Sequence, residues 1–130
     1  MGKVILVIED DPLILQFYKY IFEFEKLEAV ISEDYIEIMN IIETKNVGLI
    51  IMDVNLRNTY INEERTDGIE LSRIIKTDER YNNIPIILVS AYNLKVLDEE
   101  SIANSLADDF ILKPITDYNG FMTKVKALIN

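Results

Sequence analysis

The sequence predicts an α/β fold in which five strands alternate with five helices within a single domain, residues 1–130. Five short apolar stretches recur along the chain, and segments of helical length separate them. Within those segments the apolar residues return every three or four positions, as a helix with one buried face requires. Strict alternation of strand and helix is typical of a parallel sheet joined by right-handed crossovers. We therefore expect one (βα)5 domain without internal linkers or repeats.

The apolar stretches predict strands at 4–8, 29–31, 47–52, 85–89 and 110–112. The first, third and fourth are almost continuous Val, Ile, Leu and Met, which suits strands covered by helices on both faces. The second is short and bounded by Glu28 and Ser32, and the fifth is short and follows two aspartates. The two weak strands are best placed at the edges. This gives the order 2-1-3-4-5 of a flavodoxin-like three-layer sandwich.

The helices are expected at 12–26, 35–45, 68–80, 94–106 and 118–129. Residues typical of helix starts precede three of them. Asp11 before Pro12 is expected to be an N-cap followed by the first helical position. Thr66 or Asp67 can cap the third helix in the same way, and Asp117 can cap the last.

The composition excludes several classes of function. Apolar residues make up 49% of the chain and charged residues 28%, as in a folded globular protein. The absence of Cys and His excludes disulfides, thiolate and Ser–His catalysis, and a phosphohistidine carrier role. A net charge of −10 argues against direct binding of nucleic acid. Because the sequence contains neither a membrane span nor a signal peptide, we expect a cytoplasmic protein without membrane contact.

Polar side chains follow the strands at the points where the strands end. They are Glu9 and Asp10 after the first strand, Asp53 after the third, Ser90 after the fourth, and Lys113, followed by Pro114, after the fifth. In the order 2-1-3-4-5 the carboxyl ends of the strands meet at one edge, where such sheets bind their ligands. An acid after a strand is more often a turn residue or a helix cap. Three carboxylates, a hydroxyl and an amine at one edge nevertheless form a chemically coherent set.

The chemistry of this edge follows from its charge. Three neighbouring carboxylates need a compensating cation, and oxygen ligands favour Mg²⁺ or Mn²⁺. A phosphoryl group on Asp53 would have its charge neutralised by that cation and by the ammonium of Lys113. The hydroxyl of Ser90 can donate to a remaining phosphoryl oxygen. The peptide bond before Pro114 is of the kind that adopts the cis form, which would direct the lysine toward the site.

Across essentially all of its residues the sequence resembles the receiver domains of two-component response regulators. The resemblance lies in the motifs VILVIEDDP, LIIMDVNL, TDGIELSRIIK, IPIILVSAY and DDFILKPI. It implies that Asp53 is the phosphoacceptor, that Asp10 binds Mg²⁺ directly and that Glu9 does so through water. It further implies that the main-chain carbonyl of Asn55 is a metal ligand, and it leaves Asp11 to the helix cap.

The resemblance also implies a switch. Ser90 would move toward the phosphoryl group, and Phe110 would turn into the space behind Ser90. Alternatively, Phe110 is only a packing residue of an edge strand. The fourth helix, fifth strand and fifth helix would then re-pack and present a surface to a downstream protein. Such a domain promotes only its own phosphorylation and dephosphorylation and is not otherwise an enzyme. It would act as a monomer or a phosphorylation-dependent dimer, alone or as part of a longer regulator.

The resemblance implies partners as well. The phosphoryl donor would be a sensor histidine kinase, a histidine phosphotransfer protein or a small phosphodonor, because the chain has no His of its own.

The loop after Asp53 departs from the receiver pattern. Arg57 stands where receivers have Pro, and residues 57–66, RNTYINEERT, lengthen the loop. Lengthening a surface loop costs little free energy, so we expect a mobile polar insertion rather than a lid or a partner contact. Tyr92 is expected to slow hydrolysis of the phosphoryl group somewhat.

Two other functions remain open at this point. One is a degenerate receiver that acts only as a protein-binding module. The other is a Mg²⁺-dependent phosphatase of the haloacid dehalogenase class, which uses an Asp nucleophile and has a second acid two residues later; here that position is Asn55. A nucleotide-binding flavodoxin-like domain is disfavoured, because the chain has no glycine-rich phosphate loop.

Overall fold

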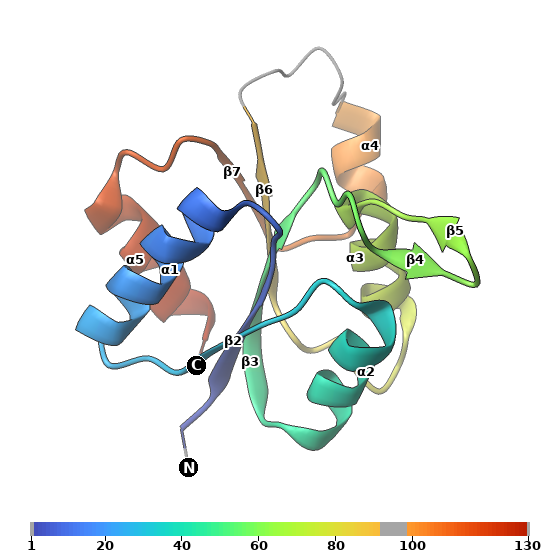
Figure 1. Ribbon diagram of the computed structural model, residues 1–130, viewed down its shortest axis with the longest axis horizontal. Coiled ribbons are helices and arrows are strands. Elements are labelled where there is room, and N and C mark those ends of the chain that lie inside the picture. The colour runs from blue at the N-terminus through green and yellow to red at the C-terminus, as the bar shows by residue number, and fades with distance from the viewer. Residues whose placement is uncertain (1, 92–98, 130) are drawn as a thin grey trace.

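A five-stranded parallel sheet forms the centre of the molecule, with helices on both of its faces (Figure 1). The computed structural model describes residues 2–91 and 99–129. The sheet has the order β2-β1-β3-β6-β7, which is the predicted order 2-1-3-4-5. Its strands are β1 (Val4–Ile8), β2 (Ala29–Ile31), β3 (Val47–Asp53), β6 (Ile86–Ser90) and β7 (Asp109–Leu112). The predicted α/β three-layer sandwich is therefore confirmed.

In the described part of the chain, five helices connect the strands and cover the sheet. They are α1 (Pro12–Phe24), α2 (Tyr35–Thr44), α3 (Gly68–Thr77), α4 (Glu99–Asn104) and α5 (Tyr118–Leu128). The third helix was predicted three residues too long. The start of the predicted fourth helix and the residue Tyr92 lie outside the described residues. Among the residues that are described, no helix is both long and apolar enough to cross a membrane.

The apolar core has two layers, one on each face of the sheet. On one face α1 and α5 cover the strands, with Tyr18, Phe22 and Phe121 in the packed layer. On the other face α2 and α3 do so, with Ile38 and Leu71 fully buried. The central strands β1, β3 and β6 are buried along their whole length, whereas β2 and β7 are only partly buried. The short strands are at the edges, as their composition predicts.

Aspartate side chains cap the starts of the helices. Asp11 accepts a hydrogen bond from the N–H of Leu13 at 2.9 Å, which confirms its predicted place in the cap of α1. Asp117 caps α5. At α3 the cap is Asp67, while the hydroxyl of Thr66 donates to the carboxylate of Glu70 instead. These caps fix where each helix leaves the carboxyl edge of the sheet.

The insertion at residues 57–66, which we expected to be a mobile polar insertion, contains an antiparallel hairpin. Its strands are β4 (Tyr60–Ile61) and β5 (Glu64–Arg65). The turn between them places Asn62 and Glu63 at positive φ, 51° and 69°, as a tight two-residue hairpin turn requires. Figure 1 shows the hairpin projecting beside α3.

The base of the hairpin is fastened by a buried threonine. Thr59 is fully buried, and its hydroxyl donates a 2.6 Å hydrogen bond to the carbonyl of Glu33 in the loop after β2. The carbonyl of Thr59 accepts the N–H of Thr66 at 2.9 Å. The hairpin therefore joins two loops at the carboxyl edge of the sheet.

Replacing Thr59 with Val should lower the free energy of unfolding by about 1–2 kcal/mol. The side-chain shape is retained, but the buried carbonyl of Glu33 loses its hydrogen-bond donor. Urea unfolding provides the measurement. The matched control is Thr44→Val, since the hydroxyl of Thr44 makes a 2.7 Å bond to a carbonyl on an exposed helix face. Equal effects of the two substitutions would show that the hairpin base is not held through Thr59.

Candidate phosphoacceptor site

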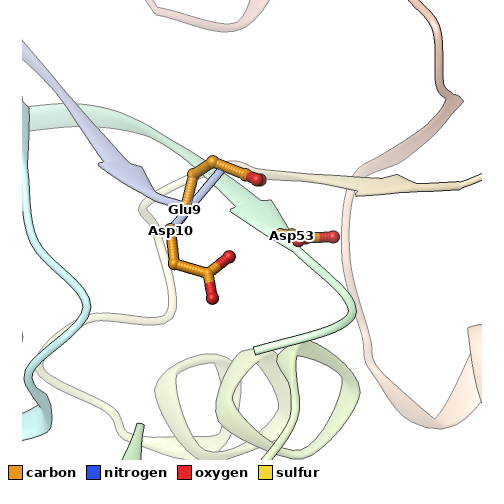
Figure 2. A group of neighbouring side chains, drawn as sticks. All are labelled: Glu9, Asp10 and Asp53. Atoms are coloured by element: carbon orange, nitrogen blue, oxygen red, sulfur yellow. The ribbon is translucent and has the colours of Figure 1, made fainter. Parts of the chain in front are cut away.

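Three carboxylates from two neighbouring strands meet at the carboxyl edge of the sheet. Glu9 and Asp10 directly follow β1, and Asp53 is the last residue of β3. Each can offer one oxygen such that these oxygens lie within 4.8 Å of one another. Figure 2 shows the three side chains gathered where the two strands end. The prediction that they would converge is confirmed by this geometry.

The amine of Lys113 lies between two of these carboxylates. Its Nζ is 3.2 Å from both carboxylate oxygens of Glu9 and 3.3 Å from Oδ2 of Asp53. Both acids are almost fully buried, and the lysine side chain is 18% exposed. The peptide bond between Lys113 and Pro114 is cis. Lys113 therefore supplies a positive charge directly beside Asp53.

Backbone groups orient the two buried acids. The N–H of Asn55 donates to Oδ1 of Asp53 at 3.2 Å, and the N–H of Asp11 donates to Oε1 of Glu9 at 3.2 Å. Asp10 is only partly buried and stands at the solvent side of the cluster. The other oxygens of these two acids, Oδ2 of Asp53 and Oε2 of Glu9, lie beside Nζ of Lys113.

One lysine does not neutralise three acids, and the pKa of Glu9 is raised by burial and by the nearby charge of Asp53. Burial raises the pKa of Glu9 to about 7, and the neighbouring charge of Asp53 adds to the rise, while Lys113 opposes it. Burial and the same two carboxylates also raise the pKa of Tyr18 beneath the site. A further cation at this edge would relieve the excess negative charge.

Raising the pH from about 5 to about 8 is expected to destabilise the metal-free protein. The pKa of Glu9 is higher in the folded state, about 7, than its ordinary value of 4.5. The stabilising contribution is therefore complete below about pH 4.5 and is lost as the pH rises through 7. Urea unfolding in EDTA across this range measures the effect. Glu9→Gln should flatten the profile, and an unchanged slope in that variant would contradict the assignment to Glu9.

Ser90 ends β6 next to the cluster. It is buried, its hydroxyl donates to the carbonyl of Ala91 at 3.2 Å, and its own carbonyl accepts the N–H of Lys113 at 2.6 Å. Phe110 pairs in register with Leu88 on β7 and β6, and its half-buried ring packs against the layer beneath α2 and α3. Ser90 thus belongs to the edge that carries the acids, whereas Phe110 lies deeper in the sheet.

Sequence reasoning missed the close packing of Gly68 against the strand that carries Asp53. A Cβ on Gly68 would lie 2.3 Å from the carbonyl oxygen of Asp53 and 2.9 Å from Cα of Val54. The N–H of Gly68 also donates to the carbonyl of Val54 at 2.8 Å. The only signal in the sequence is the Asp-Gly pair at the start of α3.

The fold is a flavodoxin-like α/β domain, and it carries a cluster of three carboxylates at the carboxyl edge of its parallel sheet. A family model for the response regulator receiver domain matches residues 5–126. The chain therefore belongs to the response regulator receiver family, and it is a CheY-like receiver domain of two-component signalling.

Known proteins agree with this assignment. The polar-differentiation response regulator DivK of Brucella ovis is 28% identical over 116 residues, which cover 89% of this chain and 88% of DivK. A CheY-like receiver domain from Methanospirillum hungatei has a TM-score of 0.78 at 27% identity, covering 99% of this chain and 94% of its own. The receiver domain of the Pseudomonas aeruginosa sensor histidine kinase PA1611 shares the fold, with a TM-score of 0.79 at 22% identity over 99% and 98% of the chains. That structure contains a magnesium ion in its active site cleft.

Proposed function

We propose that Asp53 accepts a phosphoryl group from a phosphohistidine of a sensor histidine kinase or a histidine phosphotransfer protein. The observation that carries the proposal is the position of the Lys113 amine, 3.3 Å from the carboxylate of Asp53 inside a cluster of acids. A buried carboxylate at an open sheet edge, next to a fixed cation, can react with phosphorus and have the new charge neutralised there. The receiver family supports this role.

In the proposed reaction a carboxylate oxygen of Asp53 attacks the phosphorus atom. A P–O bond forms, and the P–N bond to the donor histidine breaks. The histidine leaves with the electron pair and takes up a proton. Lys113 exchanges its contact with Asp53 for a phosphoryl oxygen, and its contact with Glu9 holds it at the site. The N–H of Asn55 keeps the carboxylate oriented.

The residues at this edge fit a divalent cation. Glu9, Asp10 and Asp53 offer oxygen ligands within reach of one ion, and burial together with the charge of Asp53 raises the pKa of Glu9 despite Lys113. These three side chains and the carbonyl of Asn55 would hold Mg²⁺ or Mn²⁺, with Asp10 the direct ligand and Glu9 acting through water. When bound, the ion supplies positive charge to the oxygens of the phosphoryl group.

We further propose that the phosphorylated site is sensed by Ser90 and Phe110. The hydroxyl of Ser90 would exchange its bond to the carbonyl of Ala91 for a phosphoryl oxygen. Phe110 is half-buried two residues before the Leu112 that pairs with Ser90, so it adjoins the space that Ser90 vacates. The surface formed by α4, β7 and α5 would re-pack and bind a downstream protein, with the domain as a monomer or a phosphorylation-dependent dimer.

Phosphorylation of the isolated protein by acetyl phosphate tests the proposal. With Mg²⁺ present, intact mass should increase by one phosphoryl group, and the adduct should hydrolyse at alkaline pH as an acyl phosphate does. A beryllofluoride mimic should shift the NMR signals of Ser90 and Phe110 without any turnover. If neither an adduct nor an NMR shift appears, the domain is a degenerate receiver that acts only as a protein-binding module. Continuous hydrolysis of a phosphate ester would instead support a phosphatase.

Replacing Lys113 with Gln should slow phosphorylation by acetyl phosphate about a hundredfold, because the fixed charge beside the transferring group is lost. At about pH 8, where Glu9 is ionised, it should also lower the free energy of unfolding by about 2 kcal/mol, since a buried carboxylate loses its partner. Rates by mass spectrometry and urea unfolding check both effects. Lys124→Gln, which breaks a more exposed ion pair with Asp109, is the matched control and should change neither much. Wild-type rates in the Lys113 variant would contradict its role.

A further inference from the structure

Three lysines surround a hollow at the amino-terminal edge of the sheet, at the other end of the strands from Asp53. The hollow has a volume of about 790 Å³ and lies between the start of β1, the turn after α1 and the turn after α2. We call it the basal hollow. Lys3, Lys26 and Lys45 line it, and Glu28 is the single acid in its lining among the described residues. Each of the three positions comes from a different segment of the chain.

The aliphatic stem of the exposed Lys3 lies over Gly48. A Cβ on Gly48, the second residue of β3, would lie 2.6 Å from Cδ and 2.7 Å from Cβ of Lys3. The absence of a side chain at Gly48 therefore leaves room for the aliphatic stem of the lysine. This contact holds Lys3 against the sheet where it lines the basal hollow.

Lys26 occupies a left-handed backbone conformation that favours glycine. Its φ is 59°, and the N–H of Leu27 donates to the carbonyl of Phe22 at 2.8 Å while its own N–H donates to the carbonyl of Glu23 at 3.0 Å. This is the helix-ending Schellman motif, whose left-handed position is usually glycine. A lysine is strained there. An unfavourable residue at such a position points to a use for its side chain.

Within the described part of the chain the three ammonium groups have no ion-pair partner, although the protein is strongly acidic overall. The net charge is −10, yet no ion pair within the described ranges involves Lys3, Lys26 or Lys45. Two of them follow the carboxyl ends of α1 and α2, where a cation is favourable. Lys3 precedes a strand, so that explanation does not extend to it. Three unpaired like charges around one hollow are best satisfied by an anion with several charges.

We propose that the basal hollow binds a pyrophosphate group, either as free pyrophosphate or within a nucleoside di- or triphosphate. The three ammonium groups match an anion carrying several charges, and the hollow is in the size range of small-molecule sites. Polar and apolar groups complete the lining: Thr44, Asn46, Val4, Leu27 and Ile129. An extended acidic peptide fits less well, because only a small part of it could contact this compact hollow.

Titration of the ¹⁵N-labelled protein with sodium pyrophosphate tests the proposal. EDTA keeps divalent cations from linking the ligand to the carboxylates at the other edge, and low ionic strength limits the screening of the lysine charges. The expected result is saturable shifts in Gly48, Asn46 and Leu27, retained in Asp53→Asn. No saturable shift at millimolar pyrophosphate, or shifts that are lost in Asp53→Asn, would overturn the proposal.

Lys26→Gly separates a ligand role from a structural one. Glycine suits the left-handed conformation, so the variant should be at least as stable as the wild type while its pyrophosphate affinity falls about tenfold. Lys19→Gln is the control, because it removes an exposed lysine that lies outside the basal hollow, and it should leave the affinity for pyrophosphate nearly unchanged. Glycine is not used at position 19, since Lys19 lies within α1. Equal losses in both variants, or none in Lys26→Gly, would reduce the binding to general electrostatic attraction and overturn the proposal.

Two further ligands identify the source of the pyrophosphate group. If ATP binds more tightly than pyrophosphate and adenosine does not bind, the ligand is a nucleoside triphosphate whose nucleoside contacts the apolar lining. Equal binding of the two would assign the site to free pyrophosphate. A poly-glutamate peptide that binds while pyrophosphate does not would overturn the proposal in favour of an acidic protein partner.

Discussion

Replacing Asp53 with Asn is expected to abolish phosphorylation by acetyl phosphate, so that no adduct appears in the intact mass. The amide has nearly the shape of the carboxylate and can still accept the N–H of Asn55, so the fold is retained. It is neutral and a very poor nucleophile, which removes the step that forms the P–O bond. The pKa of Glu9 should fall toward its ordinary value in this variant, because the charge of Asp53 is one cause of its rise.

Asp11→Asn provides the matched control for that experiment. Asp11 is exposed, follows the acidic pair directly and caps α1 through the N–H of Leu13. Asparagine caps a helix about as well as aspartate, so this variant should be phosphorylated like the wild type. Phosphorylation that persists in Asp53→Asn would show that another residue is the acceptor. Peptide mapping of the adduct would then identify it.

Replacing Gly68 with Ala should have a large effect on both stability and phosphorylation. Alanine is the better helix former, so helix propensity alone would predict a gain in stability. The added Cβ would, however, lie 2.3 Å from the carbonyl oxygen of Asp53, and backbone atoms there cannot rotate away as a flexible side chain can. We expect a loss of about 2–3 kcal/mol in the free energy of unfolding, because the start of α3 must move away from β3.

The same displacement should slow the reaction of Asp53. A misplacement of about 1 Å at a reacting group can cost about a hundredfold in rate, so acetyl phosphate should react much more slowly with Gly68→Ala. Gly2→Ala is the control, since nothing lies within 4 Å of the added Cβ, and it should match the wild type in urea unfolding and in rate. A Gly68 variant as stable as the wild type would mean that α3 can shift freely at its start.

Most of the fold could be predicted because apolar pattern and strand position are directly linked. The continuous apolar runs of β1, β3 and β6 required burial on both faces, which left β2 and β7 for the edges. The hairpin at 57–66 could not be predicted in the same way. Its strands have two residues each, and its turn places Glu63 at positive φ, a conformation that is not typical of glutamate.

The acidic edge was predictable because parallel strands end together, but its internal contacts were not. The positions of Glu9, Asp10 and Asp53 follow from where β1 and β3 end. The sharing of Lys113 between Glu9 and Asp53, and the resulting pKa of Glu9, depend on burial that only the packed structure defines. The tight contact of Gly68 likewise depends on the approach of α3 to β3, which no local pattern encodes.

The hairpin also offers a practical route to a biosensor. Its tip, Asn62 and Glu63, is exposed, while its base is joined through Thr59 to the loop after β2, and the hairpin follows Asp53 in the chain. The chain contains no Cys, so Glu63→Cys would create a unique attachment point for a thiol-reactive dye. We expect a fluorophore placed there to respond to phosphorylation of Asp53 through the chain that links Asp53 to the hairpin, without radiolabel or antibody.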